Sequence, residues 1–326
     1  MPLTIINAAG VRELLPMDEC IDAMEPAMIA ATTGTISMPP RLVAPLIDES
    51  GFLVLMPGSS TELAAFGAKV INLIPDNPAR GLPAIQGFIA LFDHASGAPV
   101  ALIDGAEVTG IRTAAASGLA TRLLARPDAH TCGIFGNGVQ AVTHIDAMRA
   151  VRPVDEIIVW GRNPDKVRAF AREQEERTGI RVRATADPAE AGACDLVCTT
   201  TTSPEPILAG DWVNPGAHVN LVGAHSITTR ECDTDLVVKS AVYVDLMESV
   251  RNEGGDIMIP IEERAIDETH IIGELGELLQ GKIPGRQDEN QVTLYQSHGI
   301  NAQDMFAAKH IYAKAQATGN ALTVDF

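Results

Sequence analysis

The chain has 326 residues, of which 46% are hydrophobic, and a formal net charge of −18 at pH 7. This length exceeds the usual size of one hydrophobic core and predicts two domains. The acidic balance and the lack of a long basic run argue against nucleic acid and anionic membranes as partners. No apolar run is long enough to cross a membrane, and the five cysteines form no CxxC pair. We therefore expect a soluble, cytoplasmic protein.

The first 120 residues predict a mostly antiparallel sheet flanked by helices. A short strand over 3–6 precedes a helical pattern over 17–33, which ends before Pro39 and Pro40. Further strands are expected at 41–46, 51–57, 65–72, 86–92 and 99–104. A long alanine-rich helix over 105–124 then leads into the next part of the chain.

After residue 130, short apolar strands alternate with helices. The strands are expected at 131–135, 156–160, 181–184, 195–200, 217–223 and 241–245. Such alternation is typical of an α/β fold with a doubly wound parallel sheet. The last segments predict a helix over 301–314 and a loose tail over 321–326.

The stretch from 131 to 141 joins a buried strand to a helix through Gly-x-Gly-x-x-Ala. Gly136 permits the tight turn, Gly138 lets a pyrophosphate approach the backbone, and Ala141 allows close packing of helix on strand. The amides of the helix N-terminus, from Val139 and Gln140 onwards, then face the phosphates. An ordinary strand–helix turn is the alternative, but an apolar strand before it and an amphipathic helix after it favour a dinucleotide site.

The residues after the second strand of this part predict which dinucleotide is bound. An acidic side chain there binds the ribose 2′-hydroxyl of NAD and repels a 2′-phosphate. The chain has Gly161, Arg162 and Asn163 at this point, and no carboxylate. The Arg162 guanidinium suits a phosphate, although a solvated turn arginine is the alternative. The sequence therefore predicts NADP(H) in preference to NAD(H).

Three basic residues of the first half lie in apolar surroundings: Arg41, Lys69 and Arg112. A cation in such surroundings is costly unless it is paired. A salt bridge or a side chain that reaches water would explain any one of them. A small anionic substrate between the domains would explain all three, with arginines on its carboxylate and the lysine as proton donor or acceptor.

Five motifs make the chain resemble the ornithine cyclodeaminase/μ-crystallin family over nearly its whole length. They lie in order at 112–117, 136–141, 204–208, 212–218 and 273–278. The resemblance implies a Rossmann NADP-binding domain over 121–300. It also implies a substrate-binding and dimerisation domain over 1–120, to which the C-terminal segment 301–326 returns, and hence a homodimer.

The resemblance also implies roles for individual residues. Arg41 and Arg112 match the family's carboxylate-binding arginines, and Lys69 matches its catalytic lysine. The residues expected to contact the cofactor are Arg112, Gly136, Gly138, Val139, Gln140, Arg162, Thr201, Val222, Gly223, Ala224 and Ser297. No spacing of His, Cys or Asp predicts a metal site.

Two departures from the cyclodeaminase pattern bear on the reaction. Val54 stands where cyclodeaminases have a glutamate, and His225 stands where they have an essential aspartate. Cyclisation of ornithine needs a base, which valine cannot supply. His225 could titrate near neutrality, or it could be a polar loop residue beside the nicotinamide.

Hydride transfer to C=N needs neither acid. We therefore expect an NADPH-dependent reductase of cyclic 2-imino acids, such as Δ1-pyrroline-2-carboxylate or Δ1-piperideine-2-carboxylate. The alternatives are a dehydrogenase of the alanine dehydrogenase or opine type, an ornithine cyclodeaminase that uses His225, and a non-catalytic NADPH-binding protein.

Overall fold

The computed structural model describes residues 2–319 and 321–325, and these form two compact units. Unit 1 comprises the chain up to Arg112 and again from Ile300 onwards, and unit 2 comprises Thr113–Gly299. The division falls inside helix α3 (Gly105–Leu124), earlier in the chain than residue 120. Residues 1, 320 and 326, which the expected domain and tail boundaries include, lie outside the described residues.

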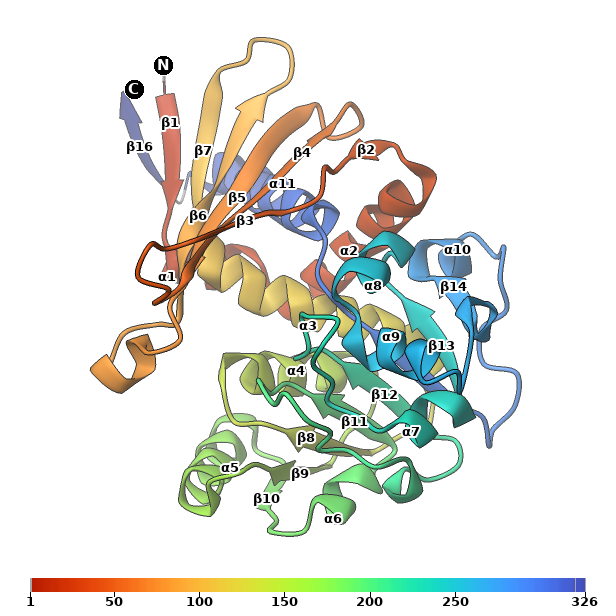
Figure 1. Ribbon diagram of the computed structural model, residues 1–326. Helices are drawn as coiled ribbons and strands as arrows, with labels where there is room; N and C mark the ends of the chain where they lie inside the picture. Colours follow the sequence, from red (N-terminus) through yellow and green to blue (C-terminus); the bar gives the residue numbers. More distant parts are fainter. Residues whose placement is uncertain (1, 320, 326) are drawn as a thin grey trace. The chain divides into compact units, whose positions relative to one another are not determined.

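Unit 1 contains a sheet in the order β16-β1-β7-β6-β5-β4-β2, with β3 paired to β4 (Figure 1). Its strands are β1 (Pro2–Ile6), β2 (Ile36–Ser37), β3 (Leu42–Pro45), β4 (Phe52–Ser60), β5 (Ala65–Leu73), β6 (Ile85–Asp93), β7 (Pro99–Asp104) and β16 (Leu322–Asp325). The antiparallel pairing expected from β3 to β7 is confirmed. The exception is β1, which runs parallel to β7.

The C-terminal segment differs from the loose tail that we expected. Helix α11 extends over Asn301–Thr318 and ends at Gly319, which has a left-handed φ of 68°. Strand β16 then pairs antiparallel with β1, so that the first and last strands lie side by side (Figure 1). The apolar–polar alternation of residues 322–325 fits such an edge strand, and pairing with it covers the open edge of β1.

One face of the unit 1 sheet is packed against α11. The other helical segments of this unit are α1 (Ala8–Leu14), α2 (Met17–Thr33), the first turns of α3, and a short 3-10 turn at Asn77–Arg80. Helix α11 contacts α2 and strands β4, β5 and β6. Alternate residues of β5 are buried, namely Ala65, Gly67, Lys69 and Ile71. Lys69 therefore lies on the face of the sheet that α11 covers.

Unit 2 has a fully parallel sheet in the order β10-β9-β8-β11-β12-β15-β13-β14. Its strands are β8 (Thr131–Phe135), β9 (Glu156–Trp160), β10 (Arg181–Ala184), β11 (Leu196–Thr199), β12 (His218–Leu221), β13 (Ser240–Val244), β14 (Ile271–Glu274) and β15 (Val292–Gln296). The chain builds outward from β8 to β10 and then in the opposite direction from β11. This reversal beside β8 defines the doubly wound Rossmann-type fold.

Two strands of this sheet were not expected from the sequence. Strand β15 lies between β12 and β13, and β14 lies at the edge. The helices of unit 2 are α4 (Val139–Val151), α5 (Pro164–Thr178), α6 (Pro188–Gly192), α7 (Thr234–Lys239), α8 (Met247–Glu253), α9 (Gly255–Glu262) and α10 (Leu275–Leu279). The core is mainly aliphatic and includes Val197, Val219, Val242 and Leu294.

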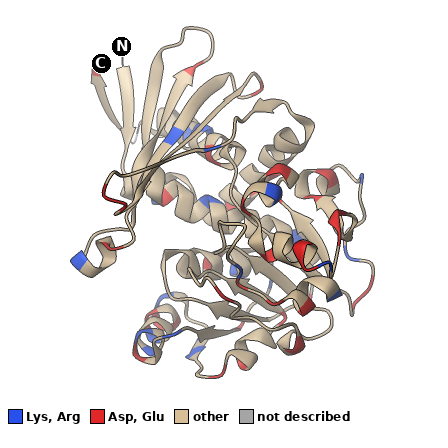
Figure 2. Cartoon of the chain, in the orientation of Figure 1, with Lys and Arg blue, Asp and Glu red and all other residues tan. Residues whose placement is uncertain are grey.

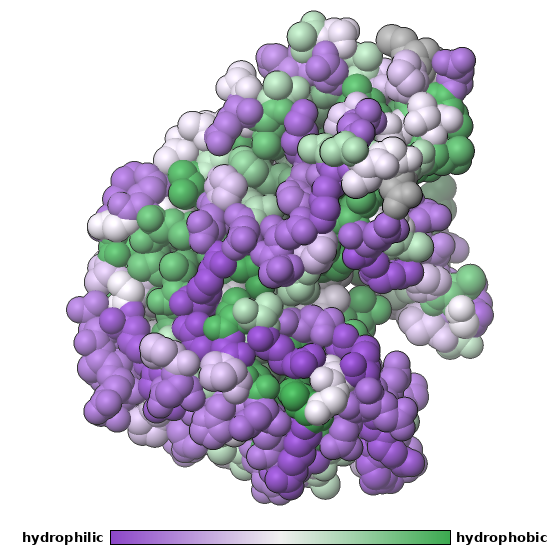
Figure 3. Space-filling model, turned by 180° about the vertical axis from the view of Figure 1, so that it is seen from behind, coloured by the Kyte–Doolittle hydropathy of each residue, from purple (hydrophilic) through white to green (hydrophobic). Residues whose placement is uncertain are grey.

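Figure 2 shows charged residues mostly on helices and loops. Lys69, in contrast, lies in the middle of β5 and is buried. The face drawn in Figure 3 mixes many hydrophilic residues with smaller groups of hydrophobic ones. Among residues 2–319 and 321–325, no helix is long and apolar enough to span a bilayer. In the same part of the chain, no group of three His, Cys, Asp or Glu side chains could hold a metal ion.

Candidate active site

Unit 1 brings Lys69 and Arg112 together on one carboxylate. Lys69 Nζ lies 3.0 Å from Asp304 Oδ1 and 2.9 Å from Oδ2. Arg112 Nε donates to Asp304 Oδ1 at 2.9 Å, and Arg112 Nη1 donates to Gln303 Oε1 at 2.6 Å. Lys69 is 1% exposed, Arg112 4% and Asp304 0%. The residues come from β5, α3 and α11, so the fold collects them from three distant parts of the chain.

Helix α11 is anchored so that its first turn lies against the sheet. Asn301 Nδ2 donates to the carbonyl oxygen of Met56 at 2.6 Å. Gly58 leaves room for this contact, because a Cβ there would lie 1.9 Å from Asn301 Oδ1. Since Met56 is the cross-strand partner of Lys69, the anchor places Asp304 within reach of the lysine.

The surroundings of Lys69 bring the pKa of its amine close to neutral pH. Burial, and next the Arg112 charge, lower the pKa of Lys69 to about 7, against the raising effect of Asp304. Burial raises the pKa of Asp304, but Arg112 and Lys69 outweigh it, and the pKa is lowered overall. Asp304 therefore remains a carboxylate, while the Lys69 amine can gain or lose a proton near pH 7.

Arg41 and Val54 belong to the same neighbourhood. Arg41 immediately precedes β3, is half-buried, and its charge also lowers the pKa of Lys69. Val54 pairs with Ile71 across β4 and β5, two residues from the Met56–Lys69 pair, and so lies on the same face as Lys69. The position where cyclodeaminases have a glutamate is thus aliphatic and close to the buried amine in the sheet.

Asp304 is the residue of this cluster that we did not predict from the sequence. Its signal was charge balance, because buried cations require a counter-ion. Asp304 lies in the first turn of the last helix, before Met305 and Phe306, but the sequence alone does not show that this carboxylate meets the two cations. Because Lys69 and Arg112 share one carboxylate, the trio is net positive when Lys69 is protonated, and such a cluster can attract an anion.

In unit 2 the glycine turn lies at the carboxyl end of β8, beside the point where the strand order reverses. Gly136 has a φ of 119°, and a Cβ there would lie 2.8 Å from Thr200 Oγ1. Gly138 is the N-cap of α4, and a Cβ there would meet no atom within 4 Å. The space beside Gly138 is therefore open, whereas Ala141 is fully buried.

Other predicted cofactor residues of unit 2 lie at the same edge of the sheet, the one formed by the carboxyl ends of the strands. Thr201, the Val222–Ala224 turn and Ser297 follow β11, β12 and β15, which are neighbouring strands. Ser297 N donates to Leu221 O at 2.9 Å, and a Cβ on Gly223 would lie 1.9 Å from Thr201 O. The Ser297 hydroxyl is buried and has no hydrogen-bond partner among the described residues.

Two further residues flank this edge. Arg162 is exposed and follows β9, whose last residue, Trp160, accepts a hydrogen bond from Gly136 N at 2.9 Å. Asn163 caps α5 with its side chain, and residues 161–163 contain no acid. His225 is exposed and follows the Val222–Ala224 turn. These donors, glycines and the unpaired Ser297 hydroxyl fit a dinucleotide laid along the edge.

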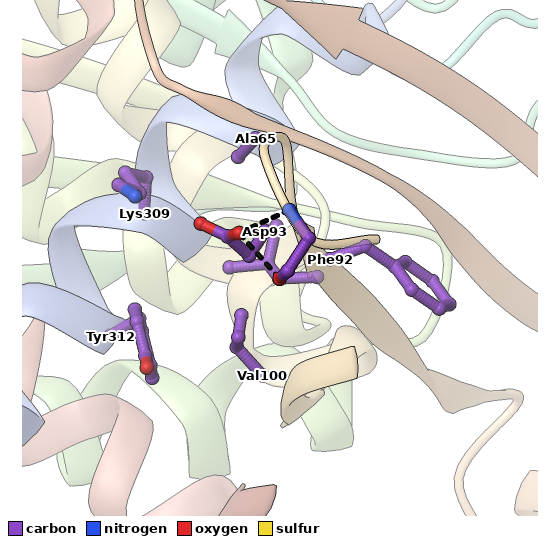
Figure 4. A pocket seen from close by; sticks show the side chains of 8 residues that line it. Ala65, Phe92, Asp93, Val100, Lys309 and Tyr312 are labelled. Atoms are coloured by element: carbon purple, nitrogen blue, oxygen red, sulfur yellow. Dashed lines mark hydrogen bonds between the residues drawn. The ribbon is translucent and has the colours of Figure 1, made fainter. Parts of the chain in front are cut away.

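A separate pocket lies within unit 1, between α11 and the end of the β6–β7 hairpin (Figure 4). Its volume is about 190 Å³, and Asp93, Lys309 and Tyr312 are among its lining residues. Asp93 accepts hydrogen bonds from Ser96 N at 2.8 Å and Ser96 Oγ at 2.6 Å. The carboxylate thus holds its own turn, and the lining includes neither Lys69 nor Arg112.

The doubly wound unit with its open glycine turn defines a Rossmann-type nucleotide-binding protein, and the buried lysine cluster distinguishes it from a simple nucleotide-binding domain. Residues 3–319 match the model of the ornithine cyclodeaminase/mu-crystallin family, and the chain belongs to that family. The family resemblance and the fold class expected from the sequence are thereby confirmed.

Known proteins resemble the chain over its full length. It is 32% identical to Δ1-pyrroline-2-carboxylate reductase of Bacillus cereus, with 99% of this chain and 100% of that protein covered. The solved structure of Thermococcus litoralis Δ1-pyrroline-2-carboxylate reductase, in complex with NADH and L-proline, is 36% identical. It has a TM-score of 0.95 and covers 99% of this chain and 100% of that one. An archaeal alanine dehydrogenase dimer with bound NAD is 30% identical, with a TM-score of 0.92 and full coverage of both chains.

Proposed function

We propose that the protein is an NADPH-dependent reductase of cyclic 2-imino acids, which transfers hydride to C=N of Δ1-pyrroline-2-carboxylate or Δ1-piperideine-2-carboxylate. The observation that carries the proposal is the buried Lys69–Asp304–Arg112 cluster, with a lysine whose pKa is about 7. The Bacillus cereus and Thermococcus litoralis relatives support this substrate class. L-proline is the amine that results when hydride and a proton are added to Δ1-pyrroline-2-carboxylate.

The charged residues of the unit 1 cluster have separate roles in the proposed reaction. Arg112, together with Arg41, binds the substrate carboxylate through charge-assisted hydrogen bonds. The Lys69 ammonium donates a proton to the imine nitrogen, which makes the adjacent carbon a better hydride acceptor. Asp304 holds Lys69 in place and favours its protonated form. After turnover Lys69 is neutral and takes up a proton from water.

Unit 2 holds the dinucleotide, which supplies the hydride when it is bound. The α4 amides behind Gly138 receive the pyrophosphate, and Thr201, Gly223, Ala224 and Ser297 receive the nicotinamide half. We propose a preference for NADPH because Arg162 is exposed beyond β9 and no acid opposes a 2′-phosphate there. The Thermococcus litoralis relative was solved with NADH, so the preference is proposed for this chain alone.

The experiment that tests the function is a substrate panel with purified protein. Oxidation of NADPH and of NADH is followed with Δ1-pyrroline-2-carboxylate, Δ1-piperideine-2-carboxylate, and pyruvate plus ammonia, and ammonia release is followed with ornithine. We expect turnover with the cyclic imino acids. Turnover only with pyruvate and ammonia would instead assign the activity of the alanine dehydrogenase relative. Ammonia release from ornithine would contradict the argument from Val54.

We also propose that the protein is a homodimer through the uncovered face of the unit 1 sheet. Leu42, Leu53 and Phe88 are 55%, 42% and 44% exposed. Leu42 pairs with Leu55, Leu55 with Val70, and Val70 with Phe88, so these side chains share one face. A contiguous apolar face of this kind marks an interaction site. A second copy of the chain is the proposed partner, in keeping with the dimeric alanine dehydrogenase relative.

A further inference from the structure

Glu231 is a buried acid at the edge of the unit 2 sheet that the sequence analysis did not single out. Its carboxylate accepts four hydrogen bonds, from Thr201 N at 2.8 Å, Thr201 Oγ1 at 2.6 Å, Thr199 Oγ1 at 2.6 Å and Gly223 N at 2.6 Å. Two of these donors are backbone amides of the turns that follow β11 and β12. One side chain therefore fixes both turns, and Glu231 itself is 0% exposed.

The backbone of the Glu231 segment is tied to a second buried acid. Glu231 N and Cys232 N donate to Asp256 Oδ1 at 2.7 and 3.1 Å. Gln296 Nε2 donates to Asp256 Oδ2 at 3.2 Å, and Gln296 is the last residue of β15 before Ser297. The two acids thus connect the ends of β11, β12 and β15, the strand ends that carry Thr201, Gly223 and Ser297.

Stability of the fold alone does not account for a carboxylate here. Burial, and next the Asp256 charge, raise the pKa of Glu231 to about 7, against the lowering effect of the threonine donors. A buried acid costs free energy, and groups perturbed in this way concentrate at functional sites. The packing of Glu231 against the second turn also leaves no room for a side chain at position 223, because a Cβ on Gly223 would lie 2.6 Å from Glu231 Oε1.

We infer that Glu231 is a positioning residue for the nicotinamide half of the cofactor: its carboxylate sets the two turns at Thr201 and Gly223 in the geometry that receives the ring. This inference rests on the proposed dinucleotide site. Glu231 should act on the nicotinamide half of that site alone. None of its four side-chain hydrogen bonds involves the glycine turn at Gly136 and Gly138 or Arg162, which belong to the other half.

The test is Glu231→Gln, because glutamine keeps the shape but places an amide NH₂ against donors that need an acceptor. Binding of NADPH is compared with binding of 2′-phospho-ADP-ribose, which lacks the nicotinamide ring, by calorimetry. We expect the dissociation constant for NADPH to rise about tenfold, as for loss of one charge-assisted hydrogen bond, with that for the fragment nearly unchanged. The kcat for imino acid reduction should fall as well.

Asp233→Asn is the matched control. Asp233 lies two residues away and caps α7, and its carboxylate accepts hydrogen bonds from Gly210 N and Leu236 N, not from Thr201 or Gly223. Asp233→Asn should lower the melting temperature, but it should not change the dissociation constant for NADPH by a different factor from that for the fragment. If Glu231→Gln does not fold, Thr199→Val removes one of the four donors and should shift NADPH binding in the same direction by a smaller factor.

The outcomes distinguish the two proposals. If the wild-type protein binds neither NADPH nor the fragment, the proposed function is wrong, and the role of Glu231 fails with it. If the wild-type protein binds both, and Glu231→Gln or Thr199→Val weakens both equally or neither, the inference about Glu231 is overturned while the proposed function stands.

Discussion

Lys69 Nζ and Asp304 Oδ2 lie 2.9 Å apart, although 235 residues separate them in the chain. The lysine comes from β5 and the aspartate from α11, so the contact forms only when the last helix packs back onto the first sheet. Because Asp304 raises the pKa of Lys69 and burial lowers it, the balance between them sets the pH at which the amine titrates.

Asp304→Asn should therefore move the pH profile of imine reduction. Without the carboxylate, burial and Arg112 act on Lys69 unopposed, and its pKa falls further below about 7. The pH above which kcat declines should shift downward by about one unit or more. Glu19→Gln is the control, since it removes a carboxylate that pairs with Lys314 of the same helix. A profile unchanged in Asp304→Asn would contradict the proposal that Lys69 is the proton donor whose titration sets it.

Lys69→Met should abolish most of the activity while the dinucleotide still binds. Methionine has a similar length and no charge, and so it suits the buried position. Loss of a positioned proton donor lowers kcat by roughly 10²–10⁴. The measurements are kcat with Δ1-pyrroline-2-carboxylate and the dissociation constant for NADPH. Near-normal turnover would remove Lys69 from the mechanism and favour a structural role in its ion pair with Asp304.

The two directions of the reaction should depend on pH in opposite ways. Reduction needs the Lys69 ammonium as proton donor, so its kcat should fall as the pH rises through about 7. Oxidation of the amine product needs the neutral lysine as proton acceptor, so its kcat should rise over the same range. Both are measured in one buffer series with NADPH or NADP⁺. If kcat changes with pH in the same way in both directions, a group other than Lys69 transfers the proton.

Strand periodicity and the glycine turn were enough to predict most elements and the doubly wound sheet, because they are local signals. The sequence does not predict strands β14 and β15, and it predicts a loose tail where β16 lies, since a short strand is stabilised mainly by its neighbours in the sheet. Lys69 and Arg112 were predicted as site residues, together with Arg41, because an anionic substrate would explain three cations in apolar surroundings and because all three match family positions. Asp304 was not, because nothing local to the last helix reveals which strand it will meet.

Arg162→Ala should reduce the preference for NADPH over NADH. Removal of the guanidinium takes away its hydrogen bonds to a 2′-phosphate and should raise KM for NADPH roughly ten- to a hundredfold. The KM for NADH should stay nearly constant. Arg168→Ala is the matched control, because Arg168 is an exposed arginine of α5 that pairs with Asp165. If both cofactors serve equally in the wild-type protein and neither KM responds, the proposed NADPH preference is wrong.

Leu53→Glu combined with Phe88→Glu should convert the protein from dimer to monomer. Both side chains lie on the exposed face of the unit 1 sheet, and a two-fold interface would bury each substitution twice. Buried carboxylates without partners disfavour association strongly. Sedimentation velocity gives the mass of the variant. Val238→Glu, an exposed apolar residue of α7, serves as the control and should remain a dimer. A wild-type monomer would refute the dimer, whereas a double variant that stays dimeric would place the interface elsewhere.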